Sequence, residues 1–131
     1  KADDTEIFCR DLVGELSVVS ESSKKMSIVM PKISRVSKLY IKTAKYVEIS
    51  GGYRKKKEFD SVVEALKDLS YRADILGRIG KAASGSYFLD DSPDDFENVF
   101  LEMINHKAHQ SEFDFSLNRV LKGCIKLKRM G

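Results

Sequence analysis

The chain has no tryptophan, and its 131 residues include only 2 prolines and 2 cysteines. Two cysteines exclude a disulfide-rich scaffold, and a chain of this length can bury a sizeable core without such crosslinks. No apolar run approaches the roughly 18 residues that a membrane-spanning helix needs. With 33% charged residues, the composition is typical of a soluble globular protein with exposed helical faces. We therefore expect a single domain over residues 1–131.

The clearest pattern is a seven-residue spacing of apolar residues between Phe59 and Ala83. Only a helix presents such a spacing as one continuous stripe, and alternating steps of three and four are typical of helices packed in a bundle. The pattern predicts a central helix over this segment. Its two series are Phe59, Leu66, Ala73 and Gly80, and Val62, Leu69, Leu76 and Ala83.

Similar periodicity predicts further helices on both sides of the central one. Their expected ranges are about 4–20, 23–49, 93–108 and 111–128. Ser92 suits the N-cap of the fourth and Pro93 its first helical position, and the apolar segment 87–89 is expected to cover one end of the core. Neither Gly nor Pro marks the last break, so 93–128 could also be one bent helix. We expect an all-α fold, an antiparallel bundle of four or five helices.

The two cysteines lie on the apolar stripes of the first and last helices. The simplest interpretation of Cys9 and Cys124 is two buried thiols that behave as small hydrophobic side chains. The alternative is a disulfide between them, which would indicate a secreted or periplasmic protein rather than the favoured cytoplasmic one. Four long helices would let the two residues approach, whereas five equal helices would place them at opposite ends of the bundle.

Two short patterns resemble chemical motifs but lack necessary parts. Glu102, His106 and His109 have a spacing that could supply three metal ligands, yet three polar residues on one helical face are common by chance. No nucleophile lies beside either histidine in the sequence. The segment 77–81 lacks the upstream Gly of a phosphate-binding loop, so its glycines Gly77 and Gly80 are interpreted as close-packing positions. We expect no catalytic residues, no metal and no cofactor.

Positive charge is concentrated in residues 22–57, which contain 11 basic residues and 1 acidic residue, whereas residues 58–116 contain 5 and 13. Helical rotation places Lys38, Lys42 and Lys45 opposite the core stripe of the second helix. Cations oppose the macrodipole at a helix N-terminus. We therefore expect residues 53–57 in a loop or a frayed turn, with the firm helix start near Ser61.

This basic face is the candidate functional site. The expected partner-binding residues are Lys32, Arg35, Lys38, Lys42, Lys45, Arg54, Lys55, Lys56 and Lys57. The favoured function is a non-enzymatic protein-binding or regulatory module that engages an acidic surface on another protein or on a second copy of the chain. The alternative is nucleic-acid binding through phosphates without sequence selectivity. A solvated face neutralised by the chain's own acidic helices also explains the charges, whereas a membrane partner is disfavoured because the opposite face is committed to the core.

Overall fold

The computed structural model describes residues 4–84 and 93–131, except the side chains of residues 93–97 and 99, and the described part contains five helices and no strand. The helices are α1 (Asp4–Glu21), α2 (Met26–Ala44), α3 (Tyr53–Ala83), α4 (Pro93–Ile104) and α5 (His106–Met130). The predicted all-α bundle is confirmed. The expected cap at Ser92 and the apolar segment 87–89 lie outside the described residues.

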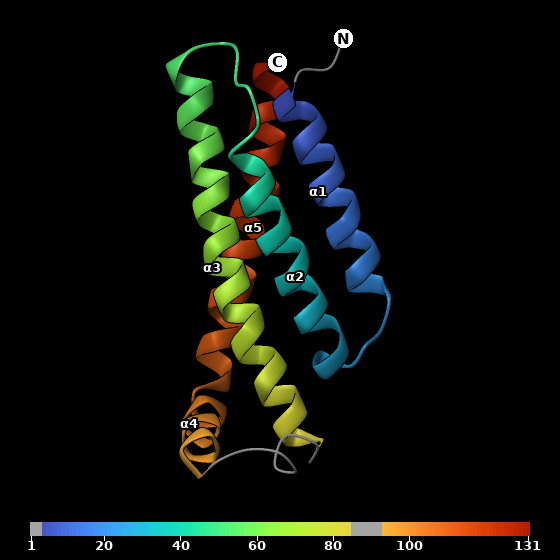
Figure 1. Ribbon diagram of the computed structural model, residues 1–131, viewed down its shortest axis with the longest axis vertical. Helices are drawn as coiled ribbons and strands as arrows, with labels where there is room; N and C mark the ends of the chain where they lie inside the picture. Colours follow the sequence, from blue (N-terminus) through green and yellow to red (C-terminus); the bar gives the residue numbers. More distant parts are fainter. Residues whose placement is uncertain (1–3, 85–92) are drawn as a thin grey trace.

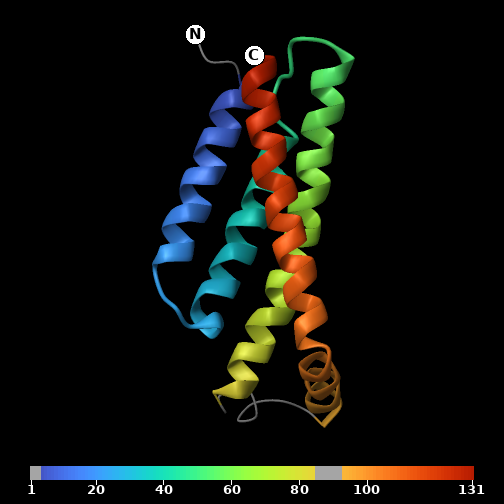
Figure 2. The same ribbon diagram turned by 180° about the vertical axis from the view of Figure 1, so that it is seen from behind.

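Four long helices form the bundle, and α4 is a short addition to it. Helices α1, α2, α3 and α5 alternate in direction, so that the first turn of α1 and the last turn of α5 lie at the same end (Figures 1 and 2). Helix α4 lies at the opposite end and turns away from the axis of α5. This arrangement corresponds to the four-helix alternative, in which the ends of the chain meet.

The break before α5 falls at Asn105, several residues earlier than the sequence predicts. The backbone N–H of Asn105 donates to the carbonyls of Leu101 and Glu102, and its side-chain amide donates to Leu101 again at 3.2 Å. An Asn side chain that competes for backbone carbonyls favours the end of a helix. The residue that marks this helix boundary is therefore an asparagine and not Gly or Pro.

Helix α3 lies at the centre of the bundle and packs on both α2 and α5. Most of its predicted apolar stripe is confirmed, because the series Phe59, Val62, Leu66, Leu69, Ala73 and Leu76 is at most 2% exposed. Ala83, the last position of the pattern, is exposed at the end of the helix. The predicted central helix is thus the element around which the core is built.

Glycines bring the backbones of α3 and its neighbours close together. A Cβ added at Gly80 would lie 2.7 Å from the backbone nitrogen of Ser27 in α2, and one at Gly77 would lie 3.3 Å from the ring of Pro31. The close-packing interpretation of both glycines is confirmed. On the α5 side, a Cβ at Gly123 would overlap a methyl group of Val62, a contact that the sequence alone did not single out.

The predicted boundaries between α2 and α3 are wrong at both ends. Helix α2 ends at Ala44, and Val47 and Ile49 pack against the core from a non-helical segment, which explains why the apolar spacing continues beyond the helix. Gly51 and Gly52 then reverse the chain with φ values of +106° and +91°, a region that side chains beyond glycine rarely adopt. Helix α3 begins directly after them.

Candidate protein-binding face

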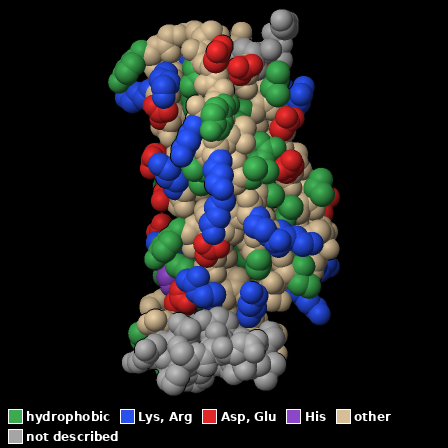
Figure 3. Space-filling view, in the orientation of Figure 1, with side chains coloured by type: hydrophobic (Ala, Val, Ile, Leu, Met, Phe, Trp, Pro, Cys, Tyr) green, Lys and Arg blue, Asp and Glu red, His purple; other side chains and the backbone are tan. Residues whose placement is uncertain are grey.

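The basic residues of α2 and of its C-cap lie on the exposed surface of the helix, and Lys38 contacts α3. Arg35, Lys38, Lys42 and Lys45 are exposed, while Lys32 is half-buried. Figure 3 shows lysine and arginine side chains gathered over the face of α2 and α3, with acidic and hydrophobic side chains between them. We call Arg35, Lys38, Lys42 and Lys45 the basic stripe.

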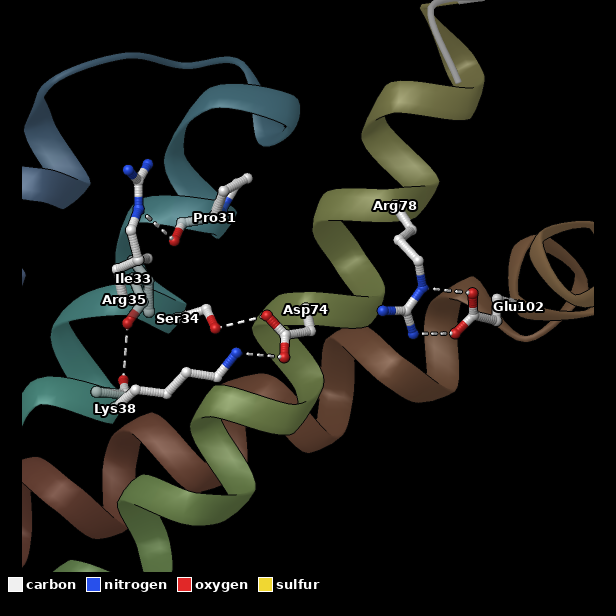
Figure 4. Close-up of polar contacts among 9 residues, drawn as sticks. Pro31, Ile33, Ser34, Arg35, Lys38, Asp74, Arg78 and Glu102 are labelled. Atoms are coloured by element: carbon white, nitrogen blue, oxygen red, sulfur yellow. Dashed lines mark hydrogen bonds and ion pairs between the residues drawn. The ribbon is translucent and has the colours of Figure 1, made fainter. Parts of the chain in front are cut away.

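One member of the basic stripe is bound by the protein itself. The ammonium of Lys38 lies 3.0 Å from Oδ2 of Asp74 in α3, and the buried hydroxyl of Ser34 donates to Oδ1 of the same carboxylate at 2.5 Å (Figure 4). The Lys38 side chain remains 55% exposed, and an exposed pair of this kind contributes about 1 kcal/mol or less. Asp74 therefore positions Lys38 at the α2–α3 junction without removing it from the surface.

Residues 53–57 are helical, which corrects the expected loop or frayed turn. Helical geometry places Lys55 four residues before Phe59, on the core side of α3. Lys55 is consequently only 4% exposed, and its aliphatic stem lies beneath Gly51. It is a buried contact of the fold and not part of an accessible binding surface.

The other cations of this turn stay at the surface. Arg54 and Lys57 are exposed, whereas Lys56 forms an ion pair of 2.6 Å with Asp60 one turn later. Of the nine residues expected to bind a partner, Lys55 is thus buried and Lys38 and Lys56 are paired. Among the described side chains, which leave out those of residues 1–3, 85–97 and 99, no carboxylate lies at ion-pair distance from Lys42, Lys45, Arg54 or Lys57.

A groove that the sequence analysis missed lies beside the basic stripe, between α1 and α2. It has a volume of about 330 Å³, and its apolar lining includes Ile7, Leu39 and Tyr46. Leu39 is 55% exposed and Tyr46 is 85% exposed. Leu39, Thr43 and Tyr46 follow one another at steps of four and three, a helical spacing that could have placed them on one face, although α2 ends at Ala44 and Tyr46 lies in the turn after it.

The α1 side of this groove is acidic. Asp4 and Asp11 line it, and Tyr40 forms its floor against Phe8, with ring centroids 5.4 Å apart. Burial, followed by the nearby Glu15 carboxylate, raises the pKa of Tyr40 to about 12. The phenol is therefore neutral at physiological pH, and the groove is flanked by acidic groups on α1 and by cations on α2.

The histidine pair does not form a metal site. Glu102 accepts hydrogen bonds from Arg78 at 3.0 and 2.6 Å, and Nδ1 of His109 lies 2.8 Å from a guanidinium nitrogen of Arg72 (Figure 4 shows the Arg78 pair). Burial and the Arg72 cation lower the pKa of His109. In the part of the chain that the structure describes, no three metal-ligating side chains come together. His106 and His109 are both half-buried, and His109 contacts Arg72 of α3.

The two cysteines meet across α1 and α5. Cys9 and Cys124 are both buried and carry no disulfide, and their thiols are hydrogen-bonded to each other. That contact and burial together raise the pKa of the Cys124 thiol. Burial of both thiols is confirmed, and so is their approach in a bundle of four long helices.

Comparisons with known proteins give no relative for this arrangement. No protein-family model, curated protein or solved structure matches the chain. Among the described helices, none is both long and apolar enough to cross a membrane.

Proposed function

We propose that this chain is a non-enzymatic protein-binding module whose α2 surface engages an acidic segment of another protein. The observation that carries the proposal is the exposure of Leu39 and Tyr46 directly beside Lys42 and Lys45. Interfaces gain most of their affinity from apolar or aromatic anchors at the centre of the contact, while charged groups around them select the partner and speed association. The α2 surface offers both kinds of group within two helical turns.

The groove between α1 and α2 suits a single apolar side chain of the partner. Such a side chain would pack against Leu39 and Tyr46, and acidic residues next to it would lie over the basic stripe. Asp4 and Asp11 on the α1 wall would repel the same acidic residues. The partner segment is thus expected to lie toward α3, with its carboxylates near Lys42 and Lys45.

The start of α3 supports this proposal because its residues are unfavourable for a helix N-terminus. Its first five residues include Arg54, Lys56 and Lys57 and no acidic residue, and Gly52 provides no side-chain cap. Each cation near a helix N-terminus opposes the macrodipole, at a cost of up to about 1 kcal/mol. Sequences that violate local rules most often do so at functional sites. Exposed cations at this turn would extend the basic stripe for a longer acidic partner.

The test is an NMR titration with a synthetic peptide of alternating glutamate and leucine, followed through backbone amide shifts. The largest shifts are expected at residues 39–46. Replacing Lys42 and Lys45 together by Glu should weaken binding about tenfold or more, because it converts attraction into repulsion. The matched control is Lys24→Glu with Lys25→Glu, an equal charge change on exposed residues at the other end of α2, which should leave affinity nearly unchanged. Equal losses in both variants, or shifts spread over the whole surface, would contradict the proposal.

Nucleic-acid binding is the second candidate, and two exposed aromatic residues favour it. Tyr46 and Tyr53 are 85% and 79% exposed at the same end of the bundle as Lys45 and Arg54. Tyrosines beside cations can stack on the bases of a single strand. Binding to single-stranded DNA should then exceed peptide binding and fall steeply between low and physiological salt. A weak DNA affinity without aromatic shifts at Tyr46 and Tyr53 would leave the protein-binding function.

A further inference from the structure

The contact between α1 and α5 combines an open groove with a pair of thiols. A groove of about 610 Å³ runs between these helices, and its lining includes Val13, Leu121 and Ile125 together with both cysteines. Only 5 of the 18 residues of α1 are buried. The helix is therefore attached to the bundle through few fully covered side chains, and Cys9 is one of them.

We propose that Cys9 and Cys124 are a reversible disulfide site, which links α1 covalently to α5 when the chain meets a small-molecule disulfide such as oxidised glutathione. Three geometric observations carry the proposal. The two thiols are in mutual contact, they come from two adjacent antiparallel helices, and both cysteines line a groove that offers a route from solvent to the sulfur atoms. Two thiols in contact can join with little movement of the backbone.

The reaction balances in two exchange steps. The Cys9 thiolate attacks one sulfur of oxidised glutathione, which forms a mixed disulfide and releases one glutathione thiolate. The Cys124 thiolate then attacks the sulfur of Cys9 and displaces the second glutathione. Overall, two protein thiols are oxidised to one disulfide, one glutathione disulfide is reduced to two thiols, and the two protons pass to the released glutathione.

Burial controls how fast the site reacts. The hydrogen bond that the Cys124 thiol donates to Cys9, followed by burial, raises the pKa of Cys124, so little thiolate is present in the closed bundle. Opening of α1 exposes both sulfurs and permits the first exchange. The disulfide then holds α1 closed, because it joins residues 9 and 124 and removes conformational freedom from the unfolded chain and from any state with α1 detached.

The experiment equilibrates the full chain with mixtures of reduced and oxidised glutathione, starting once from the reduced and once from the oxidised protein. Acid quenching, alkylation and mass spectrometry give the bridged fraction, and the same equilibrium is measured in concentrated urea. The equilibrium constant for bridging should be at least about tenfold larger in the folded chain, since the fold already holds the thiols together. The melting temperature of the bridged chain should rise by roughly 10 °C.

Two single variants serve as controls. Cys9→Ala and Cys124→Ala each keep one thiol, so they can form a glutathione adduct but no intramolecular bridge, and their melting temperatures should not rise on oxidation. A bridging constant in the folded chain that equals or falls below the value in urea would overturn the proposal. Oxidation of the folded wild type only to dimers or glutathione adducts would overturn it as well.

Discussion

Helices α3 and α1 are attached to the same bundle in very different ways. Fourteen of the 31 residues of α3 are buried, and its glycines bring it into backbone contact with α2. Helix α1 buries 5 of 18 residues and is flanked by grooves toward both α2 and α5. Gly14, near the middle of α1, has no neighbouring atom within 4 Å of the position of a Cβ. One helix thus defines the fold, while the other covers it loosely.

This contrast explains where the candidate sites lie. The groove beside the basic stripe and the thiol pair both border α1, the first toward α2 and the second toward α5. Segments with few buried contacts open at lower free energy than the rest of a protein, and binding and regulatory features are drawn from them. Helix α3, in contrast, packs closely on α2 and α5 at Gly80 and Gly123. Helix α3 therefore mainly stabilises the fold, whereas α1 borders the surfaces that a ligand can reach.

Truncation of one buried leucine in each helix should show the largest difference. Leu66 in α3 is fully buried among core residues from several helices, so Leu66→Ala should lower the free energy of unfolding by about 3–5 kcal/mol. Leu16→Ala in α1 should cost less, about 2 kcal/mol, because α1 buries only 5 of its 18 residues and can shift to fill the space that the leucine leaves. Urea unfolding followed by circular dichroism measures both values. Equal losses would contradict the contrast between the helices.

Replacing glycine by alanine should destabilise the protein at Gly80 and stabilise it at Gly14. Gly80→Ala would place a methyl group against the backbone of Ser27, so we expect a loss of about 1–3 kcal/mol. Gly14→Ala meets open space, and the higher helix propensity of Ala should stabilise the protein by up to about 1 kcal/mol. The two variants control for each other, since each adds one methyl group to a helix interior. A stabilising Gly80→Ala would show that the α2–α3 seam is looser than the structure indicates.

The fold was largely predictable because its information is local and periodic. The seven-residue spacing identified α3, and spacing alone predicted burial of both cysteines. Boundaries were less predictable. Val47 and Ile49 continue the apolar rhythm of α2 but pack from outside the helix, and only the tertiary structure determines that difference. The cations of residues 53–57 likewise argued against a helix that packing nevertheless forms.

The candidate site was predictable in its charge but not in its shape. Sequence gives the sign and spacing of Lys38, Lys42 and Lys45, and the structure leaves these residues exposed on one side of α2. The pairing of Lys38 with Asp74 and the burial of Lys55 depend on contacts between residues far apart or on a changed helix boundary. The groove beside Leu39 depends on how loosely α1 packs, which no local pattern in α2 reports. Partner binding itself stays a prediction.

The smallest expected effect concerns the contact between Arg72 of α3 and His109 of α5, which depends on pH. His109 of α5 faces Arg72 and lies near Arg78, Glu102 and His106, and burial followed by the Arg72 cation lowers its pKa. As the pH falls, the unfolded chain therefore binds the proton before the folded chain does. The stability that depends on the neutral ring is complete above about pH 6.5, the ordinary pKa of histidine, and is lost as the pH falls toward the folded-state pKa.

His109→Gln keeps an acceptor for Arg72 but cannot titrate, so its free energy of unfolding should decline less than that of the wild type between about pH 7 and 5.5. Urea unfolding at a series of pH values measures how the free energy of unfolding of each protein depends on pH. Carboxylates that titrate at lower pH affect the two proteins equally. Identical slopes would mean that the Arg72 contact does not disfavour the imidazolium, and the α3–α5 seam would then resist acid through its apolar packing alone.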